Sequence, residues 1–93
     1  MERTVWKFRI NLDDYTVLYM PKGAMSLSVQ MQGEDIVLYA LVTLPVQDDE
    51  QERRTFRLAG TGHPIELVED EWLDFIGTVM YHHGLVFHLF EVL

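Results

Sequence analysis

Apolar and polar residues alternate with a period of two along several stretches of the chain. Successive side chains of a β-strand point to opposite faces, so this period predicts strands with one buried face. In the segment Thr4–Leu12 the apolar positions are Trp6, Phe8, Ile10 and Leu12. In the segment Met25–Gln32 they are Met25, Leu27, Val29 and Met31. Both segments are predicted to turn these residues toward a core.

Five further segments are also predicted to be strands, because β-branched and aromatic residues are frequent in them. They are Tyr15–Met20, Ile36–Leu44, Arg54–Ala59, Phe75–Tyr81 and Leu85–Val92. The run Ile36–Leu44 is apolar apart from Thr43, which indicates a strand covered on both faces. In Arg54–Ala59, Phe56 and Leu58 are expected to point inward and Arg57 outward.

Turns are expected where glycine, proline or charge interrupts these patterns. Pro21-Lys22-Gly23-Ala24 fits a tight turn in which Gly23 takes a positive φ. His82-His83-Gly84 is expected to close the last hairpin. The charged segment Gln47–Arg53 is expected to be a mobile hairpin tip. The acidic segment Ile65–Asp74 fits either one or two helical turns or a loop.

These elements predict an all-β fold of about seven strands in a single domain spanning residues 1–93, with at most one short helix near residues 66–74. Short connections between the first five strands favour an antiparallel meander. Seven strands in so short a chain must curl or split into two layers to bury their apolar faces. The expected architecture is therefore a curled sheet, a small barrel or a sandwich.

Charge and composition exclude several classes of protein. The chain has 15 acidic residues against 7 Lys and Arg, a net charge of −8, and no Cys. A wide footprint on DNA or on an anionic membrane needs a basic face, which this balance disfavours. The lack of Cys excludes disulfides and thiolate sites and fits a reducing compartment. No apolar run is long enough to cross a membrane, so we expect a soluble protein.

A small basic pocket is the best candidate site. Lys7 and Arg9 share the polar face of the first strand, and Arg57 lies on the polar face of the fifth. The segment Gly60-Thr61-Gly62-His63-Pro64 follows, and its backbone amides can converge on an anion. Together these groups predict a pocket for a phosphorylated small molecule, with Trp72 at its rim. In the alternative interpretation the cations pair with nearby acids and the glycine segment is a structural connection.

No catalytic, cofactor or metal site is predicted. His82 and His83 are adjacent and would point to opposite faces of a strand, and no set of carboxylates completes a metal site with them. The chain also lacks the Gly-x-Ser-x-Gly motif and any other spacing typical of a nucleophile and its base. A binding protein is therefore a more economical interpretation than an enzyme.

Four segments together resemble a family of small phage and prophage proteins of uncharacterised function. They are Thr4–Phe8, Met20–Ala24 with Leu27–Gln30, Arg54–Ile65 and Ile76–Glu91. The resemblance implies a compact β-rich accessory protein of the bacterial host's cytoplasm, and it supplies no catalytic residues. The acidic stretch Ile65–Asp74 departs from the usual pattern of that family.

Three functions follow from these observations. The first is a non-enzymatic protein that antagonises host defence by sequestering a small nucleotide-type ligand. The second is an acidic inhibitor that imitates nucleic acid and binds a host defence protein through Asp48–Glu52 or Glu69–Asp74. The third is a structural component of the virion. A homodimer or larger assembly is expected because Ile36–Leu44 and Phe87–Leu93 offer more apolar surface than one small sheet hides.

Overall fold

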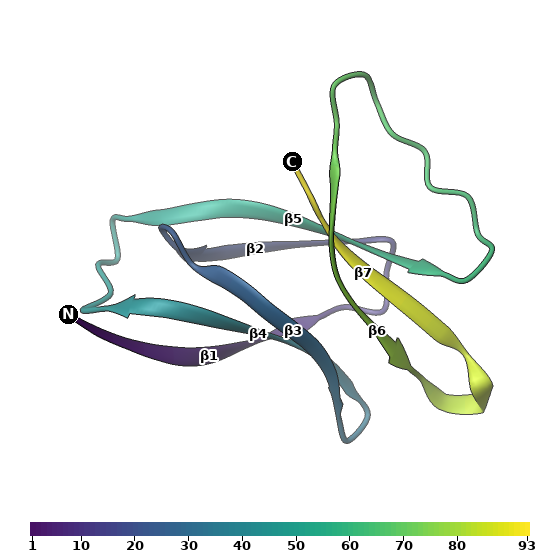
Figure 1. Cartoon of the computed structure of the whole chain (residues 1–93), viewed down its shortest axis with the longest axis horizontal. Coiled ribbons are helices and arrows are strands. Elements are labelled where there is room, and N and C mark those ends of the chain that lie inside the picture. The colour runs from purple at the N-terminus through teal and green to yellow at the C-terminus, as the bar shows by residue number, and fades with distance from the viewer.

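The computed structural model describes residues 1–93, and it is all-β (Figure 1). Its seven strands form two antiparallel sheets, which do not close into a barrel. The strands are β1 (Glu2–Ile10), β2 (Tyr15–Pro21), β3 (Met25–Gln32), β4 (Asp35–Leu44), β5 (Gln51–Gly60), β6 (Leu73–Met80) and β7 (Val86–Val92). The all-β prediction and the split into two layers are thus confirmed.

The strand order differs from a simple meander. The three-stranded sheet has the order β1-β4-β3 and the four-stranded sheet the order β2-β5-β7-β6. Of the consecutive strands, β3 with β4 and β6 with β7 are paired, and every other connection crosses between the sheets or passes over a strand. The prediction of a hairpin tip at Gln47–Arg53 is therefore wrong, because β4 and β5 lie in different sheets and residues 45–50 carry the chain from one sheet to the other. Alternation identifies strands but contains no information about which strands pair.

The core lies between the two sheets and takes side chains from both. β4 contributes Ile36, Leu38, Ala40 and Val42, and β5 contributes Phe56 and Leu58, all of them buried. Val37 on the other side of β4 is also buried. Tyr39 and Leu41 on that side are only half-buried and Thr43 is exposed, so the chain itself covers the second face of Ile36–Leu44 only in part. In each sheet we call the side facing this core the inner face and the other side the outward face.

Two bulges change the alternation that the sequence suggested. In β3 the pairing with β4 shifts between Ser26 and Ser28, so that Leu27 is the extra residue. Val29 is buried as predicted, whereas Met25 is 57% and Leu27 46% exposed. A bulge inverts the alternation on one side of itself, and this explains the error. The second bulge lies in β6 between Phe75 and Gly77.

Two further apolar positions predicted to face the core are exposed at its margin. Trp6 is 38% exposed, because β1 is an edge strand and nothing covers its outer side. Leu12 is 54% exposed, because β1 ends at Ile10 and Leu12 lies in the connection to β2.

The predicted turns are present, and the optional helix is not. Gly23 has a φ of +79°, and the amide of Ala24 donates to the carbonyl of Pro21 over 3.0 Å. His82–Gly84 forms a single 3-10 turn, in which Gly84 has a φ of +76°. Residues 61–72 contain no helix and run as a loop from β5 to β6. No helix of the structure has the length and apolar character needed to cross a bilayer.

Candidate ligand cleft

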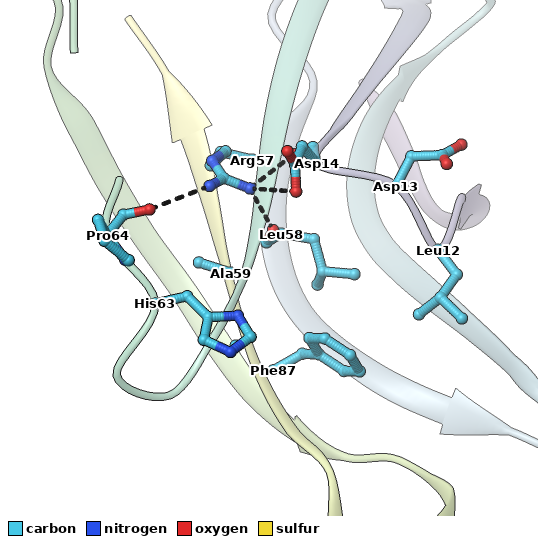
Figure 2. Close-up of a pocket in the computed structure, with 10 residues that line it drawn as sticks. Leu12, Asp13, Asp14, Arg57, Leu58, Ala59, His63, Pro64 and Phe87 are labelled. Atoms are coloured by element: carbon cyan, nitrogen blue, oxygen red, sulfur yellow. Dashed lines mark hydrogen bonds and ion pairs between the residues drawn. The ribbon is translucent and has the colours of Figure 1, made fainter. Parts of the chain in front are cut away.

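A cleft of about 360 Å³ opens where β5 ends (Figure 2). Two segments distant in sequence form most of it: the connection from β1 to β2 at Leu12–Asp14, and the end of β5 at Arg57–Gly60 with the loop residues His63 and Pro64 that follow. Phe87 of β7 closes one side. The cleft is therefore a product of the tertiary fold, with charged groups on one wall and apolar groups on the other.

Arg57 is the principal charge of the cleft. Its side chain is 9% exposed, and one Nη1–H group lies 3.0 Å from Asp14 Oδ1. Nη1 also donates to the carbonyl of Leu58 over 2.6 Å, and Nη2 to that of Pro64 over 3.5 Å (Figure 2). The guanidinium lies 5.3 Å from the centre of the Tyr15 ring, within the range of a cation–π contact. These contacts fix Arg57 in place, and its buried Nε has no partner.

The ion pair of Arg57 is asymmetric. The Arg57 side chain is almost fully buried, whereas the Asp14 carboxylate is 80% exposed. Asp14 belongs to the connection between β1 and β2 and not to a strand. An exposed carboxylate gains little from such a pair because water competes for it. A ligand anion can therefore replace Asp14 at modest cost, while Arg57 keeps its position.

The glycine segment forms a tight turn at the edge of the cleft. The amide of His63 donates to the carbonyl of Gly60 over 3.1 Å, and Gly62 has a φ of +84° that favours glycine. A Cβ on Gly60 would lie 2.9 Å from Nδ1 of His63. The exposed imidazole of His63 thus packs over Gly60, where it faces the cleft (Figure 2).

A histidine bound by two threonines anchors this turn to the four-stranded sheet. His88 Nε2 lies 2.7 Å from the hydroxyl of Thr61, and Nδ1 lies 2.9 Å from the hydroxyl of Thr78. The amide of Thr61 also donates to the carbonyl of Val86 over 3.2 Å. Thr61 faces a second hollow of about 470 Å³ on the other side of the turn. The turn therefore has a structural role, as the alternative interpretation held, in addition to lining the cleft.

The predicted basic pocket is not assembled. Arg57, Gly60 and His63 line the cleft, Thr61 lines the neighbouring hollow, and Gly62 lies in the turn between them. Lys7 and Arg9 lie instead on the outward face of the three-stranded sheet, where Lys7 donates to Gln32 over 2.8 Å and Arg9 pairs with Asp35 at 3.5 Å. The prediction that they join Arg57 is wrong. β1 pairs with β4 and not with β5, and neither cation lines the cleft.

Trp72 lies outside the cleft as well. Its backbone pairs with that of Leu93 in both directions, at 2.9 and 2.8 Å, and its side chain is 71% exposed. It is the last loop residue before β6. We call the segment Ile65–Asp74, which includes the first two residues of β6, the acidic arm. The second acidic segment, Asp48–Glu52, lies at the opposite end of the molecule (Figure 1). The two acidic segments therefore do not form one surface.

Sequence reasoning missed Asp14, Leu12 and Phe87 as parts of the site. Asp13-Asp14 was recognised as an interruption between strands, which is the signal that marks a loop, but nothing in the sequence places that loop beside Arg57. No group of three or more His, Asp or Glu residues is arranged to hold a metal ion.

These features define a small two-sheet β-protein with a mixed polar and apolar cleft beside a glycine turn. The chain belongs to the family described as a domain of unknown function, DUF7352, whose family model matches residues 1–93. Comparison with curated proteins and with solved structures finds no match.

Proposed function

We propose that this is a non-enzymatic binding protein that captures a small nucleotide-type ligand with a single phosphate in the Arg57–His63 cleft. The observation that carries the proposal is a buried guanidinium whose carboxylate partner is exposed and replaceable. Charge-assisted hydrogen bonds from such a group are stronger than those between neutral groups.

The size and lining of the cleft restrict the class of ligand that it can bind. About 360 Å³ is near the lower limit for small-molecule sites and suits a mononucleotide better than a larger ligand. Phe87 and Leu12 offer apolar contact, and the imidazole of His63 offers a hydrogen bond or a stacking surface. Arg57 is the one Lys or Arg of the lining and Asp13 and Asp14 are at its rim, so a chain of phosphates is disfavoured.

The biological role rests on the resemblance to phage accessory proteins. A phage protein that sequesters a nucleotide would deprive a host defence system of its signal. In this role the protein acts by binding alone, in the cytoplasm of the host.

Calorimetric titration with cyclic and linear mononucleotides tests the proposal. We expect saturable binding of at least one of them to the wild type. Asp14→Asn should raise its affinity severalfold, because it removes the carboxylate that competes for Arg57. His63→Ala should lower the affinity, whereas His83→Ala, in the exposed turn between β6 and β7, serves as the matched control. Absence of heat with every nucleotide at high protein concentration would reject the proposal.

The acidic arm supports a second candidate, an inhibitor directed at a protein. Leu67, Val68 and Trp72 are 47%, 68% and 71% exposed among five acidic side chains of the arm. Charge gives steering toward a basic partner, and exposed apolar groups supply affinity once it docks.

Retention of host proteins on the immobilised protein distinguishes this candidate from the first. One basic partner should be retained, in a manner sensitive to salt, and Trp72→Ser should release it. His63→Ala should leave it bound. Retention that is unaffected by Trp72→Ser would eliminate the arm as the binding surface.

A further inference from the structure

The outward face of the four-stranded sheet is mostly apolar, and its polar members in β5 include Arg53, Thr55 and Arg57. Two neighbouring rows cross the four strands in register. One row consists of Tyr15, Arg57, Phe90 and Phe75, and the next of Val17, Thr55, Val92 and Leu73. Residues directly opposite one another in an antiparallel sheet share a face, so these side chains form one continuous surface. We call these eight residues the aromatic face.

Much of the aromatic face is open to solvent. Tyr15 is 48%, Val17 39% and Phe75 58% exposed, and the ring of Phe75 packs at 5.5 Å on that of Phe90. Tyr19, next along β2 on the same side, is 66% exposed. Large contiguous apolar patches are uncommon on monomeric proteins and mark sites of interaction.

The distribution of charge favours a second copy of the chain on this face. The protein carries 15 Asp and Glu, yet none of them is among the residues that the four strands direct outward. Two loop carboxylates, Asp14 and Glu66, lie at one edge of the face beside Tyr15 and Arg57, and the rest of the face is without them. Two copies, each with a net charge of −8, repel one another. Contact between identical copies is therefore least unfavourable where carboxylates are absent, and a two-fold axis matches this face with itself.

The total exposed area of the chain is large for its mass, as expected of a chain that buries further surface in a dimer. The chain exposes 6356 Å². A monomeric protein of its mass is expected to expose about 5,600 Å² from the scaling of area with mass. The excess of roughly 800 Å² over the whole chain is of the same order as the area that each partner buries in a standard protein–protein interface.

We propose that the protein is a symmetric homodimer whose two copies pack aromatic face against aromatic face. Of the two segments expected to drive association, Phe87–Leu93 contributes Phe90 and Val92 to this face, whereas Ile36–Leu44 lies in the other sheet and contributes nothing to it. The ligand cleft adjoins this face, and Arg57 belongs to both.

Sedimentation equilibrium of the full chain tests the dimer. The wild type should reach about 22 kDa, twice the mass of one chain. Phe75→Asp and Val17→Asp each place a charge in the interface, and each should weaken association at least tenfold. Val5→Asp is the matched control, since Val5 is 51% exposed on the outward face of the other sheet. It should leave the dimer intact.

Circular dichroism of each variant shows whether it remains folded, and both target positions are exposed enough to accept a polar side chain. A wild type that remains at the mass of a single chain at all concentrations overturns the proposal. So does a dimer that persists in both folded interface variants, or one that dissociates through Val5→Asp.

Discussion

Two arginines of β5 illustrate how burial of the partner decides the role of a charge. Arg57 on the outward face pairs with a carboxylate that is 80% exposed. Arg54 on the inner face pairs with Glu91 through two contacts of 2.7 Å, with side-chain exposures of 16% and 9%. It also donates to the carbonyl of Ala24 over 2.5 Å, which ties the four-stranded sheet to the start of β3. Arg54 is thus a structural group, and Arg57 is available to a ligand.

Removing one partner of the Arg54–Glu91 pair should destabilise the protein more than replacing both partners with apolar residues. Glu91→Leu leaves a cation without its partner in a nearly dry site, and we expect a loss of about 3 kcal/mol in the free energy of unfolding. The double variant Arg54→Met/Glu91→Leu removes both charges and should recover at least half of that loss. Urea unfolding measures both values. A double variant as unstable as Glu91→Leu alone would contradict the explanation.

The contribution of Arg54 to the free energy of unfolding should not change with pH in the neutral range. The hydrogen bond with Glu91 raises the pKa of Arg54 above its usual value, and burial opposes this more weakly. A raised folded-state pKa gives stability that is complete below the unfolded-state pKa and is lost only at higher pH. That loss therefore lies in strong alkali, beyond conditions in which the protein would be studied.

At the scale of elements, the bulges of β3 and β6 decide how the two sheets meet. These strands lie against one another at the junction of the sheets, without a ladder of hydrogen bonds between them. Gly77, directly after the bulge of β6, lies against Val29, the first residue of β3 that returns to the core. A Cβ at position 77 would lie 2.8 Å from Cγ1 of the buried Val29. The close approach of the two strands therefore requires glycine at this position.

Gly77→Ala should destabilise the protein by about 1–3 kcal/mol, because the clash is with a packed side chain that has no room to move. Val29→Ala removes the clashing methyl group. In the Val29→Ala background the further cost of Gly77→Ala should be smaller by about 1 kcal/mol or more, a coupling that a double-mutant cycle in urea unfolding detects. Equal costs in both backgrounds would show that the contact does not determine the spacing of the strands.

At the scale of the whole molecule, net charge and apolar surface act against each other. The charge of −8 repels a second copy, whereas the aromatic face attracts it. Salt screens the repulsion and leaves apolar burial intact. Raising the ionic strength from about 0.05 M to about 0.5 M should therefore strengthen the dimer severalfold in sedimentation equilibrium. Weaker association at high salt would indicate contact through the acidic arm and a basic surface.

The periodicity of the sequence determined the strands, because a pattern of period two is a local property that burial on one face imposes. All seven predicted segments are strands, Gly23 has the predicted positive φ, and His82–Gly84 connects β6 and β7 as expected. Local patterns do not reveal a bulge such as the one at Leu27. The prediction therefore assigned the inner and outer residues at the start of β3 to the wrong faces.

The tertiary structure alone decided which strands became neighbours and therefore which charges share a surface. The sequence identified Arg57, Gly60 and His63 because they are close along the chain. It could not show that Asp14 and Phe87 join them, or that Lys7 and Arg9 do not. Strand order depends on long-range packing. Alternation placed Lys7, Arg9 and Arg57 on polar faces of their strands, but the pairing of β1 with β4 puts the first two in a different sheet from Arg57.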